Sequence, residues 1–327
     1  MNNLLRLIGR RLVALPIMVI GVTFLVFFIM SLSPTDPAYA ALGDNAANAA
    51  QVKAFRVAHG YTYADGTPVP MLIRYANYLA GILQGNFGVY GVSNNSVGEL
   101  IGPALPITLQ LTFFGLIIAV LFSFPLGVLA ALYRDKWPDQ LIRIISVVSI
   151  GTPSFWLGAM LVLIGLSIFP GMVAGPLPPL LGSGADFGGW LSRMFLPSLT
   201  LAVPVIGQMT RVVRTSVVEE LDRDYVRTAQ GAGIPKAIVI GRNVLRNALI
   251  TPVTVLGLRV GYLMGGAVVI EIIFGIQGMG KVLVQGIQQN QVEVVQGAAL
   301  VVALAFIIVN IIVDMLYLLI NPRIRSV

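Results

Sequence analysis

The sequence predicts an all-α polytopic membrane protein with six transmembrane helices. Of its 327 residues, 57% are hydrophobic and only 11% are charged, and the mean hydropathy is +0.87. A soluble domain has roughly a quarter of its residues charged. Six apolar runs are also long enough to cross a bilayer, which takes about 20 helical residues for each crossing. Composition and run length therefore agree on the class of protein.

The six apolar runs also predict an orientation in the membrane. They cover residues 12–32, 104–133, 141–168, 194–217, 250–273 and 296–320. Most of the 21 Lys and Arg residues fall in alternate connections, around Arg10-Arg11, Arg134, the stretch 211–246 and Arg323. Since basic connections stay on the cytosolic side, both termini are expected in the cytosol.

The first connection, residues 33–103, is long and lies on the opposite, extracytoplasmic side. Helical composition at 46–58 and apolar spacing at 71–83 predict two helices, separated by Gly66-Thr67-Pro68. Its many tyrosines favour a small folded cap over disorder. Trp190, near the end of the second outer connection, is expected to anchor at the membrane interface. Two regions follow: residues 1–103, the first span with its cap, and residues 104–327, a five-helix core.

Residues 218–249, called the coupling loop below, form the longest charged connection on the cytosolic side. Glu219 and Glu220 open it, a short helical stretch around Tyr225 follows, and Gly231 and Gly233 break it before a second helical run. A short helix exposed on the cytosolic side can receive mechanical work from another protein. The alternative is a solvated positive loop without a partner.

Enzymatic chemistry finds little support in the sequence. There are no cysteines and one histidine, His59, so disulfides and a His/Cys metal cluster are excluded. Residues 275–281 fit the phosphate-loop pattern G-x-x-x-x-G-K, but Val282 stands where Ser or Thr would hold magnesium. The segment is expected outside, at the end of the fifth span. We therefore expect a non-catalytic chain that binds no cofactor.

Two features lie within the predicted spans. Gly257, Gly261 and Gly265 recur every fourth residue and predict a helix face for close packing, either within the chain or against a partner. Arg259 and Asp314 lie inside the fifth and sixth spans, where a charge needs a partner or a water-filled passage. Arg259 is expected to line the passage, pair with Asp314 or extend toward the cytosol. Glu271 suggests an external gate or a helix-end contact.

Several segments resemble those of one known family when taken in order. They are Arg10-Arg11-Leu12, Ser33-Pro34-Thr35-Asp36-Pro37, Gln84-Gly85-Asn86-Phe87-Gly88, Leu105-Pro106-Ile107-Thr108-Leu109, Thr152-Pro153-Ser154-Phe155, Asp224-Tyr225-Val226-Arg227-Thr228-Ala229 with Gly233, Glu271-Ile272-Ile273-Phe274 and Asn321-Pro322-Arg323-Ile324-Arg325. The coupling loop is similar to the "EAA" loop of binding-protein-dependent ABC importer permeases. The whole chain resembles the dipeptide/oligopeptide/nickel branch, "B" type.

This resemblance implies a type I importer permease fold in the bacterial inner membrane and a pore shared with a "C" type permease. It also implies two ATPase subunits that bind ATP and magnesium, and an extracytoplasmic substrate-binding protein. Asp224, Tyr225, Arg227, Thr228, Ala229 and Gly233 would then contact the ATPase. Arg227 stands where the general motif has Glu, and Arg259 where a neutral residue such as Gln is commoner.

Peptide is the cargo that the resemblance implies, although nickel, glutathione and haem occur among similar permeases. The principal alternative is an ion-coupled secondary transporter of small solutes. Such a transporter would place carboxylates near the midplane and show repeated halves. Glu271 and Asp314 lie toward opposite ends of their spans, and the sequence shows no such repeat. An intramembrane enzyme lacks H-E-x-x-H and a Ser/His pair within spans.

Overall fold

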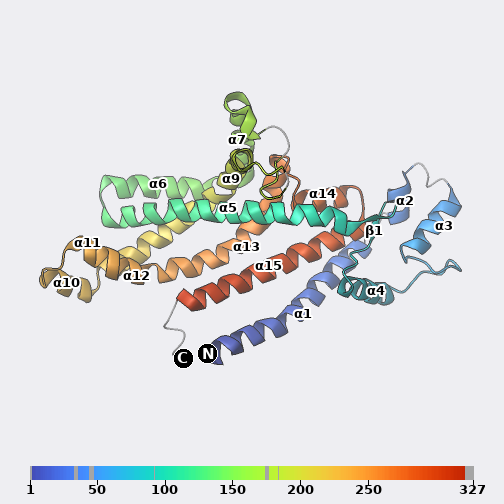
Figure 1. Ribbon diagram of the computed structural model, residues 1–327, viewed down its shortest axis with the longest axis horizontal. Helices are drawn as coiled ribbons and strands as arrows, with labels where there is room; N and C mark the ends of the chain where they lie inside the picture. Colours follow the sequence, from blue (N-terminus) through green and yellow to red (C-terminus); the bar gives the residue numbers. More distant parts are fainter. Residues whose placement is uncertain are drawn as a thin grey trace. The chain divides into compact units, whose positions relative to one another are not determined.

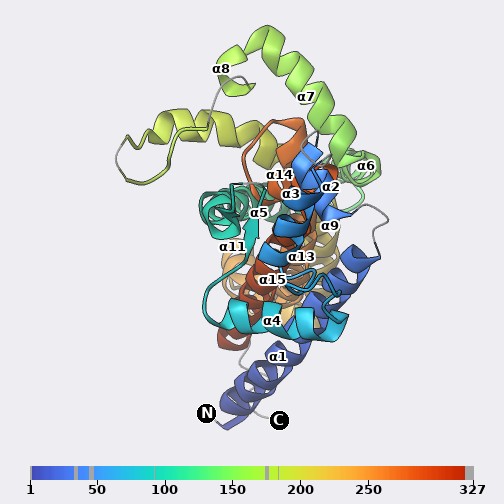
Figure 2. The same cartoon turned by 90° about the vertical axis from the view of Figure 1, so that its right-hand side faces the viewer.

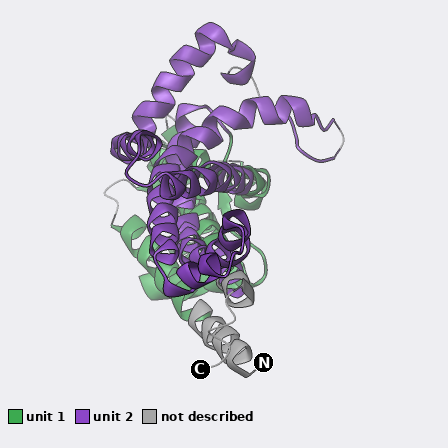
Figure 3. Ribbon diagram, turned by 90° about the vertical axis from the view of Figure 1, so that its left-hand side faces the viewer, with its two compact units in different colours: residues 1–108, 277–308 green, residues 109–276, 309–327 purple. Residues whose placement is uncertain are grey.

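A computed structural model describes residues 2–32, 36–43, 48–91, 93–173, 177–182 and 184–320, although the side chains of residues 2–15, 314 and 316–320 are not described (Figure 1). The motif residues Ser33-Pro34-Thr35 and Asn321–Arg325, and the side chain of Asp314, therefore lie outside the described part. The chain forms two compact units (Figure 3). Unit 1 contains residues 1–108 and 277–308, and unit 2 contains residues 109–276 and 309–327.

Unit 1 begins with α1 (Asn2–Ser31), followed by three short helices, α2 (Pro37–Leu42), α3 (Ala49–Ala58) and α4 (Met71–Leu83). The side chains of Asp36 and Asn48 accept hydrogen bonds from Ala38 N and Ala50 N, so they cap the starts of α2 and α3. The helix expected at 71–83 is thus present with those bounds, and the one expected at 46–58 is described from Ala49.

The rest of unit 1 is a second packed group. Strands β1 (Val89–Tyr90) and β2 (Asn95–Ser96) pair antiparallel, with Val89 opposite Ser96. They lead into α5 (Val97–Leu132), whose first turns pack against α14 (Met279–Gln288) and the start of α15 (Val292–Ile320). The core of this group contains Val97, Ile101, Ala104, Met279, Val294, Ala298 and Val301.

Unit 2 is built around α9 (Phe187–Leu221), which packs against α5, α6 (Trp137–Gly151), α7 (Ser154–Ile168) and α13 (Ile250–Ile273). Its core includes Leu111, Ile118, Met194, Leu201, Met209, Leu263 and Ile270. Trp190 belongs to this core: it is 5% exposed and its Nε1 donates to Gln110 Oε1 at 2.8 Å. The expected interfacial anchor is therefore a buried core residue, because α9 begins before it and Gln110 satisfies its N–H.

Four helices of the described part are long and apolar enough to span a membrane: α5, α9, α13 and α15. The expected third span, 141–168, is not one straight helix. It is broken into α6 and α7, which meet at an angle of 98° (Figure 2). Thr152 has extended backbone angles because Pro153 disfavours a helical residue before it. Counting this bent pair as one span gives five. The first predicted span, 12–32, lies in α1, where the described apolar stretch is the shorter Pro16–Ser31.

Candidate coupling site

The coupling loop folds as a series of short helices at one end of α9 (Figure 1). They are α10 (Asp224–Gly231), α11 (Lys236–Ile238), a π-helical turn (Val239–Val244) and α12 (Leu245–Ala248), and α13 follows directly. The break between α10 and α11 falls at Gly233, whose φ of +79° is strained for any residue with a Cβ. The two helical stretches and the glycine break are as the sequence predicts.

One face of α10 is fixed to the protein's own core. Val226 is 2% exposed and packs with Val213 and Val217 of α9 and with Val239 and Val244 of the returning chain. Beside it, the Tyr225 hydroxyl donates to Glu220 Oε1 at 2.9 Å, and burial raises the pKa of that phenol. Ala229 is half-buried against the same cluster. α10 is therefore seated firmly on the end of α9.

The opposite face of α10 is open. The side chains of Asp224 and Arg227 are 99% and 76% exposed, and Thr228 is exposed beside them. Arg227 Nη1 lies 3.9 Å from Asp224 Oδ1, a contact of little strength between exposed groups. Every residue from 231 to 238 is also exposed, including Ile234 and Ile238. This surface offers charged groups and two apolar side chains to another molecule.

The sequence predicted the six coupling residues as one group, whereas the structure places them in three different surroundings. Asp224, Arg227 and Thr228 lie on the open face, Gly233 forms the turn, and Tyr225 and Ala229 contact the chain itself. A larger side chain at Ala229 would therefore disturb the seat of α10 as well as any outer contact.

Ion pairs that the sequence did not reveal tie the end of α9 to the α5–α6 turn. Arg214 Nε and Nη2 donate to Asp139 Oδ1 and Oδ2 at 2.6 Å each, and the Asp139 side chain is fully buried. The backbone N–H of Asp135 also donates to Asp139, at 2.9 Å. Near the surface, Arg134 Nη1 donates to Asp222 at 2.9 Å, one residue beyond α9. Arg214 is one of several charged residues of α9, so the sequence offered no signal that singled it out.

Of the three intramembrane residues, the structure describes the side chains of Arg259 and Glu271. Glu271 is fully buried in the last turn of α13, and its role as an external gate or a helix-end contact stays a prediction. Arg259 is half-buried, and its Nε is buried without a hydrogen-bond partner among the described residues. The predicted pairing with Asp314 involves a side chain that lies outside them.

The glycine face of α13 is divided. A Cβ at Gly257 would lie 2.6 Å from Val313 Cγ1 of α15, whereas at Gly265 it would meet nothing within 4 Å. Eight helical residues turn the side-chain direction by about 80°, so Gly257 and Gly265 face different surroundings. The closest backbone approaches are at glycines without such spacing. A Cβ at Gly207 would lie 2.6 Å from Ser146 O, and one at Gly127 would lie 2.9 Å from Thr210 O.

The phosphate-loop pattern does not form a phosphate site. Met279, at the start of α14, is fully buried, and its N–H donates to the Thr108 hydroxyl at 2.8 Å. A phosphate loop needs such N–H groups at a helix start to point at the ligand. The interpretation of residues 275–281 as a structural turn therefore agrees with the geometry, as does the positive φ of Gly275.

Membrane-length helices joined by a short helix that is seated on one face and exposed on the other fit a membrane transport component. The chain belongs to the family of binding-protein-dependent transport system inner membrane components, whose family model matches residues 123–326. The predicted family is thereby confirmed, and the chain is a component of the inner membrane.

Two curated relatives match almost the whole chain. The probable D,D-dipeptide transport system permease protein DdpB of Escherichia coli K12 is 36% identical, over 97% of each chain. The glutathione transport system permease protein GsiC of Salmonella typhimurium LT2 is 38% identical, over 98% of this chain and 99% of the relative. A solved amino acid ABC transporter gives a TM-score of 0.47 at 17% identity, over 69% of this chain and 94% of that one. That likeness is too low to add to the assignment.

Proposed function

We propose that this chain forms half of the translocation pore of an ATP-driven importer and that its cargo is a short peptide delivered by an extracytoplasmic binding protein. The observation that carries the proposal is the two-faced α10, with Val226 buried in the protein and Asp224, Arg227 and Thr228 open to a partner. The names of both relatives specify transport of short peptides, which supports the cargo.

In the proposed complex, a second permease of "C" type completes the pore, and two cytosolic ATPases bind ATP and magnesium. Both termini lie in the cytosol, six helices span the membrane, and the open face of α10 docks in a groove of one ATPase. Arg227 pairs there with a carboxylate of the ATPase. Its contact with Asp224 is weak and does not prevent this pairing. The chain itself performs no catalysis.

The mechanism is alternating access. ATP-driven closure of the ATPases moves α10, and because Val226 and Tyr225 fix α10 to α9, the motion passes into the helix at the centre of unit 2. The ion pairs Arg214–Asp139 and Arg134–Asp222 carry it on to the α5–α6 turn. The pore then opens outward to receive cargo, and hydrolysis returns it to the inward-open state.

Reconstitution tests the proposal against its alternative, ion-coupled transport. The complete complex, in lipid vesicles with ionophores that collapse all ion gradients, should accumulate a labelled dipeptide when ATP and the loaded binding protein are supplied. A matched complex whose ATPases bind but cannot hydrolyse ATP should not. Accumulation by the isolated chain, or accumulation that stops when the ion gradient collapses while ATP remains, would contradict the proposal.

Cargo is tested separately in the same vesicles. An excess of unlabelled di- and tripeptides should compete with the labelled peptide, whereas nickel ions and haem should not. Competition by nickel or haem alone would replace the peptide assignment and leave the importer assignment intact.

A further inference from the structure

One face of α4 is packed against α1 along the outer half of that helix (Figure 2). The ring of Tyr75 lies 5.3 Å from that of Phe24 and 5.4 Å from that of Phe27, between ring centres. The Tyr75 hydroxyl donates to Ile20 O and shares a hydrogen bond with Thr23 Oγ1, at 2.9 Å each. α4 is therefore attached to residues within the first predicted span and not to a loop above it.

The depth of this contact follows from the geometry of α1. The apolar run of α1 ends at Leu32, so Thr23 and Ile20 lie roughly 14 and 18 Å inside it at about 1.5 Å per residue. The hydrocarbon core of a bilayer is about 30 Å thick. The Tyr75 hydroxyl thus lies well inside the hydrocarbon, and the α4 backbone, one tyrosine side chain away, lies at the level of the outer leaflet.

The face of α4 turned away from α1 is open and mostly apolar, and Asn77 is the one polar residue exposed on it. Its apolar residues are Leu72, Ile73, Ala76, Ala80 and Leu83, and Leu72 and Leu83 are 71% and 88% exposed. Because these residues recur at helical spacing, they form one stripe of the helix. Exposed apolar surface of this kind marks contact with a membrane or another protein.

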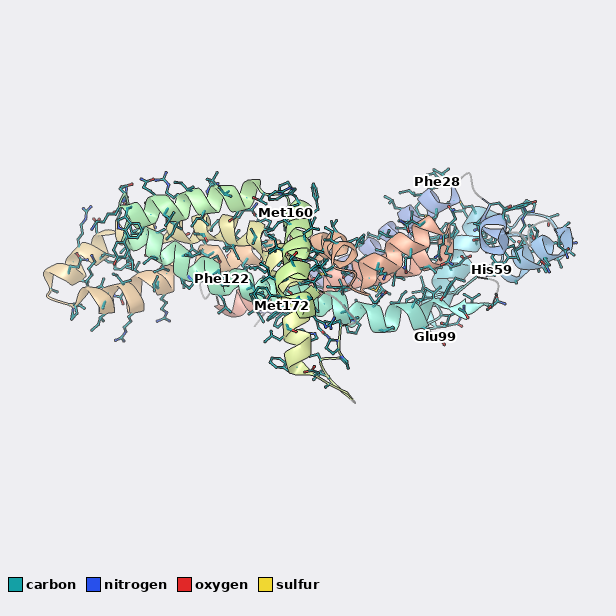
Figure 4. The ribbon with its side chains drawn as sticks, turned by 90° about the horizontal axis from the view of Figure 1, so that it is seen from above. Phe28, His59, Glu99, Phe122, Met160 and Met172 are labelled. Atoms are coloured by element: carbon teal, nitrogen blue, oxygen red, sulfur yellow. The ribbon has the colours of Figure 1, made fainter. Side chains whose placement is uncertain are left out.

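The outer half of α1, against which α4 packs, also exposes apolar side chains. Leu25, Ile29 and Leu32 are 57%, 56% and 65% exposed, and Phe28, labelled in Figure 4, is 43% exposed. α1 is the first predicted span, so this surface faces lipid. Lipid around α1 would therefore also reach the helix packed on it.

Arg74 and Tyr75 of α4 are turned toward the protein, whereas Asn77 is exposed. The Arg74 guanidinium lies 4.3 Å from the Tyr61 ring centre and 5.6 Å from that of Phe27, and the Tyr61 hydroxyl donates to Glu293 at 2.8 Å. No charged residue lies on the stripe formed by Leu72, Ile73, Ala76, Ala80 and Leu83.

We propose that α4 is an interfacial helix embedded in the outer leaflet, with the stripe Leu72, Ile73, Ala76, Ala80 and Leu83 in contact with lipid acyl chains. Helices of this type lie in the membrane plane with their apolar face about 5–10 Å below the headgroups. The inference rests on the membrane orientation in the proposed function. It assigns lipid to α4 and leaves α2, α3 and the turn around Asp65 to contact the binding protein.

Because the chain has no cysteine, single cysteines can be introduced without altering other residues. Leu72→Cys and Leu83→Cys test the stripe, Leu25→Cys reports the lipid-facing surface of α1, and Lys53→Cys on α3 reports the aqueous cap. The complete complex carrying each variant is reconstituted outside-out in vesicles. Two readouts are measured: the labelling rate with a membrane-impermeant maleimide, and the quenching of an attached bimane by brominated acyl chains.

We expect Leu72→Cys and Leu83→Cys to label at least about ten-fold more slowly than Lys53→Cys and to be quenched as strongly as Leu25→Cys. Labelling as fast as Lys53→Cys without quenching would overturn the proposal. Slow labelling without quenching would also overturn it, because a neighbouring permease would then cover the stripe. Labelling that becomes slow only when the binding protein is added would overturn it as well, because the binding protein would then be the occupant. If Lys53→Cys labels only from the cytosolic side, the membrane orientation is wrong, while quenching still decides whether α4 contacts lipid.

Discussion

Asp139 on α6 and Arg214 on α9 form a two-point ion pair around a carboxylate that has no exposed surface. Both oxygens of Asp139 accept from the guanidinium, and one also accepts from the Asp135 N–H. A buried charge is tolerated only when it is paired in this way. The pair holds two helices together at the end of α9 from which α10 continues.

Replacing Asp139 by Asn should destabilise the protein by roughly 3–5 kcal/mol, because the Arg214 charge is then left without its partner. Thermal unfolding of the purified complex measures the loss. Asp222→Asn is the matched control: it breaks the exposed pair with Arg134 and should cost no more than about 1 kcal/mol. Equal losses of stability in the two variants would show that the buried Asp139–Arg214 pair contributes no more than the exposed pair.

The turn after α10 provides the sharpest test of coupling. Gly233→Ala places a Cβ at a φ of +79°, which costs about 1–2 kcal/mol and should be relieved by moving α10. We expect peptide uptake to fall several-fold while the membrane helices remain folded. Uptake and ATPase retention on the purified permeases are the measurements.

Gly231→Ala is the control for this turn, since a Cβ there meets nothing within 4 Å and φ is not positive. It should leave both readouts unchanged. Gly233→Asn, which tolerates the left-handed region, should give intermediate uptake. Equal uptake in all three variants would show that the backbone conformation of Gly233 is not needed for ATPase coupling.

The position of helices could largely be read from the sequence, but their directions and contacts could not. Apolar runs and Gly/Pro breaks gave α4 and α13 their bounds, because both signals are local. The 98° bend at Pro153 was missed, since hydrophobicity counts residues in a run and carries no information on direction. Asp139 and Arg214 are 75 residues apart, and neither sequence neighbourhood indicates the other.

Close packing shows the same limit. Spacing drew attention to Gly257, Gly261 and Gly265, yet Gly207, with no glycine near it at four-residue spacing, makes the closer backbone approach. Whether a glycine is needed depends on what lies opposite, which only the tertiary structure gives.

Gly207→Ala should destabilise unit 2 by about 1–3 kcal/mol, because its Cβ would lie 2.6 Å from Ser146 O and 2.9 Å from Ser149 Cβ. Gly265→Ala should leave the thermal stability of the isolated chain unchanged, as its Cβ meets only open space. Unfolding of the isolated chain compares the two. Stability lost at Gly265 and retained at Gly207 would contradict the packing described for α9 and α13.

The Tyr61–Glu293 hydrogen bond should make unit 1 sensitive to alkaline pH. Burial first, and then the Glu293 charge, raise the pKa of the Tyr61 phenol above its unfolded value of 10.0. A raised folded pKa means that the neutral phenol is stabilised by folding. Its contribution is fully present below pH 10 and is lost as the pH rises from there toward the folded pKa.

Tyr61→Phe removes this contribution, and loss of a hydrogen bond to a charged group should cost about 1.5–3 kcal/mol. The melting temperatures of wild type and variant should differ at about pH 8, and the difference should shrink progressively as the pH rises above about 10. Tyr63→Phe, at an exposed tyrosine two residues away, is the control and should show no such difference. A Tyr61→Phe difference that is constant across this range would show that phenol ionisation is not linked to folding.

Arg259 provides the last prediction, since its buried Nε has no partner among the described residues and Asp314 remains the predicted one. If the two charges pair, Arg259→Asp and Asp314→Arg should each abolish uptake, and the double variant should restore it in part, because the exchange keeps one charge of each sign within the membrane. If Arg259 instead lines the passage, Arg259→Gln should lower uptake of peptides with a free carboxylate more than uptake of their amides, and the exchange should rescue nothing. Uptake of both peptide forms in the four variants separates these cases. Full uptake in every variant would contradict both cases and favour the third alternative, in which the Arg259 side chain extends its charge toward the cytosol.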